Sequence, residues 1–131
     1  MRLLIVDNQR TIPIALSRLL TPRGFSPSVA FSGRESLELI RNHSFDLMLL
    51  EFRVPDMRGD EILRKAVTMR RHLGTRTLFM TGDYSRQGLG LIENTGRPYL
   101  LKPFEIAILV HELHHLAGGE PPTTEHERRT A

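Results

Sequence analysis

The stretch that decides the fold spans residues 45–59 and reads FDLMLLEFRVPDMRG. Its first half is a short apolar run that ends at Glu51, and its second half carries Pro55 and Gly59 before a helix-like pattern begins. An apolar run of this length between turn signals is typical of a buried parallel strand. An acid at the carboxyl end of such a strand points into the crevice where open α/β sheets bind ligands. Glu51 is therefore the first candidate functional residue.

Strand-like and helix-like segments alternate on both sides of this stretch. We expect strands at residues 2–6, 25–30, 46–50, 77–80 and 98–101. We expect helices at about residues 11–20, 33–41, 60–73, 84–94 and 104–117. The alternation predicts an α/β fold with a doubly wound, five-stranded parallel sheet. Pro27 places the second strand at a sheet edge, which suits the strand order 2-1-3-4-5.

Three local signals bear on the predicted helices. Pro13 is tolerated only in a first helical turn, so the first helix begins near Thr11 or has a distorted first turn. Ser32 and Glu35 have the spacing of a capping box at the start of the second helix. Two glycines interrupt the helix predicted at 84–94, and each costs about 1 kcal/mol relative to alanine. We expect this helix to be the most mobile element.

Length and composition exclude several classes of protein. The chain has 131 residues, enough for one domain with a real core. It has no cysteine, no apolar run long enough to cross a membrane and no signal peptide, so we expect a cytoplasmic protein. The net charge is +3, but the arginines are scattered and aromatic residues make up only 6%, so nucleic-acid binding is not favoured.

The sequence from Gly118 onward is polar, contains proline and glycine, and has no periodicity. We therefore expect one domain at residues 1–117 and a disordered polar tail at 118–131. Met1 and this tail favour an intact single-domain protein, without a DNA-binding output domain, over a fragment of a larger kinase or regulator.

Polar residues follow four of the predicted strands, and they are Asp7 with Asn8, Glu51, Thr81 and Lys102. In the predicted strand order these carboxyl ends converge at one edge of the sheet. Carboxylates and a backbone carbonyl hold Mg²⁺, which keeps several waters. A hydroxyl and an ammonium suit the oxygens of a phosphoryl group.

Together these motifs make the chain resemble the receiver domain of bacterial two-component response regulators, which has the CheY-like fold. The resemblance extends from residue 2 to about residue 117. It rests on Ile5-Val6-Asp7, on DLMLLE at 46–51 with PDMRG at 55–59, on Thr81-Gly82 and on Lys102-Pro103-Phe104. It implies a signalling role, with a sensor histidine kinase or a downstream signalling protein as partner, and no enzyme activity.

The resemblance also implies a metal site. Asp7 matches an acid that holds Mg²⁺ directly or through water, and the backbone carbonyl of Arg53 matches another ligand. Glu51 stands at the position of the phosphate-accepting aspartate, and Asn8 stands where the family has a second acid. Asn8 removes a negative charge, so any Mg²⁺ should bind weakly.

The remaining matches imply a switch. Thr81 matches the hydroxyl that follows the phosphoryl group, and Tyr99 matches the aromatic side chain that rotates inward with it. Lys102 matches the lysine that pairs with the acceptor and its phosphate, and the bond before Pro103 would then be cis.

The glutamate at position 51 decides between two functional interpretations. Its side chain reaches one bond further into the crevice than aspartate, and in-line transfer tolerates little misplacement. We therefore predict a pseudo-receiver in which Glu51 is not efficiently phosphorylated and contacts Lys102 or Thr81 instead. Such a pair either holds a fixed state that mimics phosphorylation or is merely structural. The alternative function is a competent receiver that uses Mg²⁺ and a histidine kinase.

Two further features remain open in the sequence. Residues 111–115 read HELHH and match the H-E-x-x-H zincin pattern, but Pro121 stands where the longer pattern needs a third histidine. Adventitious metal binding or an exposed polar helix face explains these residues better. The helices predicted at 84–94 and 104–117 form the face through which the family often makes dimers, so a homodimer is a second hypothesis.

Overall fold

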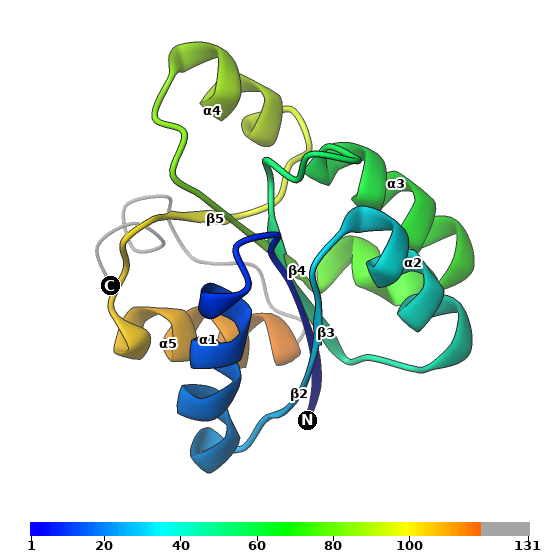
Figure 1. Ribbon diagram of the computed structural model, residues 1–131, viewed down its shortest axis with the longest axis vertical. Coiled ribbons are helices and arrows are strands. Elements are labelled where there is room, and N and C mark those ends of the chain that lie inside the picture. Colours follow the sequence, from blue (N-terminus) through cyan, green and yellow to red (C-terminus); the bar gives the residue numbers. More distant parts are fainter. Residues whose placement is uncertain (119–131) are drawn as a thin grey trace.

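A five-stranded parallel sheet forms the centre of this computed structural model, which describes residues 1–118 (Figure 1). The strands stand in the order β2-β1-β3-β4-β5, which confirms the predicted order with the Pro27 strand at an edge. Their bounds are β1 Arg2–Val6, β2 Ser26–Ala30, β3 Leu47–Glu51, β4 Thr77–Thr81 and β5 Tyr99–Leu101. β3 lies in the middle, and all five of its residues are buried.

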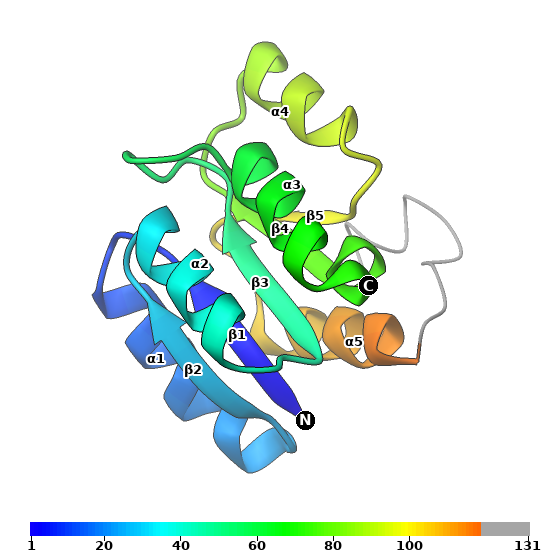
Figure 2. The same cartoon turned by 90° about the vertical axis from the view of Figure 1, so that its right-hand side faces the viewer.

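Helices cover both faces of the sheet. Their bounds are α1 Thr11–Leu20, α2 Gly33–Asn42, α3 Gly59–Met69, α4 Arg86–Glu93 and α5 Ile106–Ala117. Figure 2 shows α2 and α3 in front of the sheet and α1 and α5 behind it. α4 stands apart from the other helices in both views (Figures 1 and 2). The architecture is therefore the predicted CheY-like α/β fold.

The alternation of side chains along β1 divides the core into two layers. Leu4 and Val6 pack in one cluster with residues of α2 and α3, whereas Leu3 and Ile5 pack in a second cluster with residues of α1 and α5. All four side chains are fully buried. Burial of each contributes about 1.5–3 kcal/mol relative to exposure. This two-sided burial explains why the strands read as continuous apolar runs.

Local signals set the starts of α1 and α2 as predicted. Ser32 Oγ accepts a hydrogen bond of 3.0 Å from the backbone N–H of Glu35, and Glu35 Oε1 accepts one of 2.8 Å from the N–H of Phe31. α1 begins at Thr11, so Pro13 falls in the first helical turn.

The peptide bond between Lys102 and Pro103 is cis, as the family resemblance implied.

Three predicted helix bounds were wrong. α3 ends at Met69 rather than near Leu73, because Arg70 is extended (φ −138°, ψ 91°) and a 3-10 turn, Arg71–Thr75, follows. α5 begins at Ile106 rather than 104, because Glu105 is extended and occupies the N-cap position. α4 begins at Arg86 rather than 84, because Ser85 is extended and caps the helix. The tail predicted at 118–131 lies, apart from Gly118, outside the described residues.

Candidate functional site

Lys102 joins the ends of β1 and β3 at one edge of the sheet. Its Nζ lies 2.6 Å from Asp7 Oδ2 and 2.6 Å from Glu51 Oε1. The side chains of Asp7 and Glu51 are 0% and 7% exposed, and that of Lys102 is 17% exposed. These three predicted site residues therefore form one nearly buried ion-pair cluster.

Backbone amides occupy the other oxygen of each carboxylate. Asp7 Oδ1 accepts a hydrogen bond of 2.9 Å from the N–H of Gln9, and Glu51 Oε2 accepts one of 2.8 Å from the N–H of Arg53. Each of the four carboxylate oxygens thus has a hydrogen-bond donor. Buried charges are tolerated when they are paired and hydrogen-bonded in this way.

The two carboxylates keep Lys102 charged. Burial of the ammonium pushes the pKa of Lys102 downward, but hydrogen bonds and charge interactions with Asp7 and Glu51 outweigh burial. The pKa of Lys102 therefore lies above its ordinary value of 10.5. The cluster holds an ammonium throughout the neutral range.

Thr81 and Tyr99, the two predicted switch residues, are both buried, at 0% and 6% exposure. Thr81 Oγ1 accepts a hydrogen bond of 3.1 Å from the N–H of Asp83. Of the two predicted contacts of the Glu51 carboxylate, the structure has the one to Lys102. The Tyr99 hydroxyl donates to Glu93 Oε1 at 3.3 Å, which links β5 to α4.

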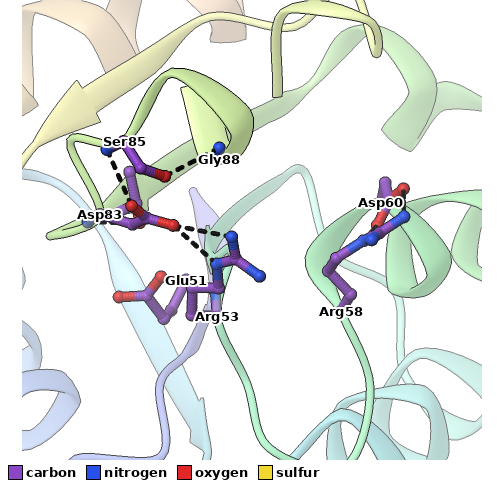
Figure 3. Close-up of polar contacts among 8 residues, drawn as sticks. Glu51, Arg53, Arg58, Asp60, Asp83, Ser85 and Gly88 are labelled. Atoms are coloured by element: carbon purple, nitrogen blue, oxygen red, sulfur yellow. Dashed lines mark hydrogen bonds and ion pairs between the residues drawn. The ribbon is translucent and has the colours of Figure 1, made fainter. Parts of the chain in front are cut away.

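Arg53 and Asp83 form an ion pair that the sequence analysis missed (Figure 3). Arg53 Nε and Nη2 lie 2.9 Å and 2.7 Å from Asp83 Oδ2. Hydrogen bonds from Ser85, together with Arg53, lower the pKa of Asp83 to about 2. The sequence signal that could have revealed this pair is the opposite charge of Arg53 and Asp83. Each lies two positions after a candidate residue, Glu51 or Thr81, at the end of neighbouring strands.

Asn8, the remaining predicted residue at the end of β1, is exposed.

Asp56 is a second missed residue. Its two carboxylate oxygens accept hydrogen bonds of 2.9 Å from the N–H groups of Gly33 and Arg34 at the start of α2. Burial raises the pKa of Asp56, but these two bonds outweigh it, so the pKa lies below 3.8. The loop after β3 therefore holds the first turn of α2.

The histidine motif on α5 contains a buried acid. Glu112 is 2% exposed, so the interpretation of these residues as an exposed polar face was wrong at this position. Glu112 lies three residues after Leu109 and four before Leu116, on the face of α5 that packs in the core. Within residues 1–118 no group of three His, Asp or Glu side chains could hold a metal ion.

A family model described as the response regulator receiver domain matches residues 3–114. This chain belongs to the response regulator receiver family. Receiver domains are signalling domains of two-component systems, not enzymes, and they pair with histidine kinases. The structure is similar to that of a CheY-like receiver domain from Methanospirillum hungatei, with a TM-score of 0.82 and 28% identity over 90% of this chain and 94% of that one.

Curated receiver proteins are similar in sequence. The chain is 32% identical to the transcriptional regulatory protein DltR of Streptococcus agalactiae over 108 residues, which are 80% of this chain and 46% of that protein. It is 30% identical to the response regulator MprA of Mycolicibacterium vanbaalenii over 121 residues, which are 92% of this chain and 52% of that protein. This receiver chain spans about half the length of the curated relatives it matches.

Receiver domains typically bind Mg²⁺. The residues of this receiver fit that ion poorly. The Lys102 ammonium lies between the carboxylates of Asp7 and Glu51, and amide donors occupy their other oxygens. At position 8 the chain has a neutral amide. A divalent cation would therefore compete with the ammonium for these oxygens.

No helix within residues 1–118 of this receiver has both the length and the apolar character needed to cross a membrane.

Proposed function

We propose that this chain is a pseudo-receiver, in which Glu51 is not phosphorylated and the domain acts through protein contacts in one fixed state. The observation that carries the proposal is the pair between Glu51 Oε1 and Lys102 Nζ at 2.6 Å. The lysine that the resemblance assigns to the phosphate is thus engaged by the longer acid. The same acid accepts the N–H of Arg53, so each of its oxygens has a hydrogen-bond donor.

Two properties of the site support the absence of phosphorylation. Glu51 carries its carboxylate further from the backbone than aspartate, and small misplacements strongly reduce the rate of in-line transfer. The Lys102 ammonium lies between the two carboxylates and Asn8 contributes no charge, and both features disfavour a divalent cation at this site. Without a divalent cation, the charge that develops on a transferred phosphoryl group has little compensation.

The buried Tyr99 supports a fixed state. In the family the matching aromatic side chain turns inward when the switch hydroxyl moves, and Tyr99 is 6% exposed with its hydroxyl on Glu93 of α4. We infer that the Glu51–Lys102 pair keeps this arrangement without a phosphate. A purely structural pair is the competing interpretation, and it predicts that Tyr99 is indifferent to the residue at position 51.

The partner of this fixed state is a downstream signalling protein or a sensor histidine kinase in the cytoplasm. A hollow of about 300 Å³ lies along β5 and α5 and is lined partly by Tyr99, Leu101, Phe104 and Ile108. Aromatic side chains are enriched at protein–protein interfaces, so Tyr99 and Phe104 suit a protein partner. A second copy that binds the α4 and α5 face is the other candidate, and light scattering after size-exclusion chromatography tests it. A monomer at high concentration would exclude the homodimer.

The decisive experiment is intact-mass measurement after incubation with acetyl phosphate and Mg²⁺. The proteins are the wild type, Glu51→Asp, and the double variant Asn8→Asp with Glu51→Asp, with Glu51→Ala as the unreactive control. We expect one added phosphoryl group on the double variant and none on the wild type. A phosphoryl group that maps to Glu51 of the wild type would establish the alternative, a competent receiver with an unusual acceptor.

A further inference from the structure

We propose that the Arg53–Asp83 ion pair is a latch that holds the loop before α4 against the ion-pair cluster of Asp7, Glu51 and Lys102 and so fixes the position of α4. The inference deepens the proposed function, on which it rests for the idea that one state is held without phosphate. Arg53 follows β3 by two residues and Asp83 follows β4 by two residues. The latch therefore joins two loops that border the cluster (Figure 3).

The first step is the link from the ion-pair cluster to Arg53. Glu51 Oε2 accepts the N–H of Arg53 at 2.8 Å, so the glutamate that pairs with Lys102 also orients the backbone of Arg53. The guanidinium then directs Nε and Nη2 at one oxygen of Asp83. Two donors from a rigid planar group restrict the direction of the contact as well as its distance.

The second step runs from Asp83 into α4. Asp83 Oδ1 accepts the N–H of Ser85 at 2.9 Å, and Ser85 Oγ accepts the N–H of Gly88 at 3.0 Å. Ser85 is the N-cap of α4. Asp83 therefore uses one oxygen for Arg53 and the other for the residue that begins the helix.

The third step concerns the glycine at position 88. A Cβ atom built there would clash with Asp83 Oδ2, the oxygen that accepts both donors of Arg53. A Cβ built at Gly90, in the same helix, would have no atom within 4 Å. The close approach of Asp83 thus requires glycine at 88 and does not require it at 90.

The fourth step is that the apolar packing of α4 is limited. Gly88 and Ile92 are its two buried residues, Leu89 and Leu91 pack against the core while only partly buried, and the helix stands apart from the other helices (Figure 1). The loop before α4 is also held by a hydrogen bond from the Tyr84 hydroxyl to the carbonyl oxygen of Lys102. Its far end is joined to β5 through Glu93 and Tyr99. A polar latch at the first turn therefore has a large share in placing a helix that apolar packing holds weakly.

The test is amide hydrogen exchange of the full chain, without any phosphate donor. The variants are Arg53→Ala and Asp83→Asn, and the latter keeps an acceptor for Ser85 but removes the charge that faces Arg53. The matched control is Arg58→Ala, because the Arg58–Asp60 pair has nearly the same exposure, 46% and 28% against 46% and 24%. Figure 3 shows the two pairs together.

We expect the amides of residues 89–94 to exchange about two- to five-fold faster in both latch variants, as suits an exposed ion pair that controls local opening. The double variant should be no faster than either single one, Arg53→Lys should fall between Arg53→Ala and the wild type, and Arg58→Ala should match the wild type. The NMR signals of the Tyr99 ring should shift in Arg53→Ala and should stay at their wild-type positions in Arg58→Ala. Unchanged exchange in Arg53→Ala, or an equal increase in Arg58→Ala, would overturn the latch.

A second pair of variants tests the latch independently. Alanine favours helix over glycine by about 1 kcal/mol, so Gly90→Ala should slow exchange in α4. Gly88→Ala should speed it, because its methyl group displaces Asp83. Equal slowing in both variants would contradict the latch. Phosphorylation of wild-type Glu51 would refute the pseudo-receiver and would leave these exchange results unaffected, so the two ideas fail separately.

Discussion

Lys102 and Glu51 form an ion pair of 2.6 Å across 51 positions of sequence. The pair occupies the edge of the sheet at which a receiver carries its chemistry. The family resemblance assigns both residues to phosphotransfer, and in this structure they are hydrogen-bonded to one another. Asp7 completes the cluster from β1, so a single ammonium neutralises part of the charge of two buried acids. The following predictions depend on this cluster and on the loops around it.

Replacing Lys102 with alanine should strongly destabilise the fold. The carboxylates of Asp7 and Glu51 would lose the cation between them, and removal of one partner from a buried pair costs about 3 kcal/mol or more. Urea unfolding measures the change. Lys65→Ala is the control, since it breaks the exposed pair with Glu61 and should cost less than about 1 kcal/mol. Equal stability of the wild type and Lys102→Ala would refute the pairing.

Acid should weaken the Asp83 contacts within a defined pH range. The pKa of Asp83 is about 2 in the folded protein against an ordinary 3.8. The folded state therefore resists protonation, and the stabilisation is complete above about pH 5 and is lost as the pH falls toward 2. Asp83→Asn should be less stable than the wild type at pH 6, and the difference should shrink below pH 4. Parallel curves of unfolding free energy against pH would contradict the shift.

Asp56 should stabilise α2 from outside the helix. Asp56→Ala leaves the N–H groups of Gly33 and Arg34 without their acceptors, and a lost N-terminal cap costs about 1 kcal/mol. Asp56→Asn keeps one side-chain acceptor and should lose less. Chemical denaturation gives both values. If Asp56→Ala were as stable as the wild type, these two bonds would have no net value.

Magnesium should stabilise a repaired site and not the native one. Asn8→Asp with Glu51→Asp adds one carboxylate and shortens another, which should raise Mg²⁺ affinity. A concentration ten times Kd would stabilise this double variant by about 1.4 kcal/mol. Thermal unfolding with and without MgCl₂ measures the gain, with CaCl₂ and NaCl as controls. A comparable gain in the wild type would show that Lys102 gives way to the ion.

Much of the architecture could be predicted from the sequence. Strands of a parallel sheet are buried on both faces, so they appear in the sequence as continuous apolar runs that differ clearly from amphipathic helices. Pro27 has no backbone N–H for a hydrogen bond to a neighbouring strand, so its strand lies at an edge of the sheet. Parallel strands end at one edge, so Asp7, Glu51 and Lys102 had to converge there once the strand order was known. The element types depend on local hydrophobic periodicity, and the convergence of the strand ends depends on connectivity. Both can be read from the sequence without knowledge of side-chain packing.

The tertiary structure decided which partner each polar group takes. Glu51 had either Lys102 or Thr81 within reach, and the contact to Lys102 depends on side-chain direction in the folded sheet. Arg53 meets Asp83 through loop geometry that no periodicity encodes. Glu112 is buried because its neighbours on α5 face the core, although its sequence context reads as polar. Ion pairs and burial depend on the packing of segments distant in sequence, so only the folded chain determines them.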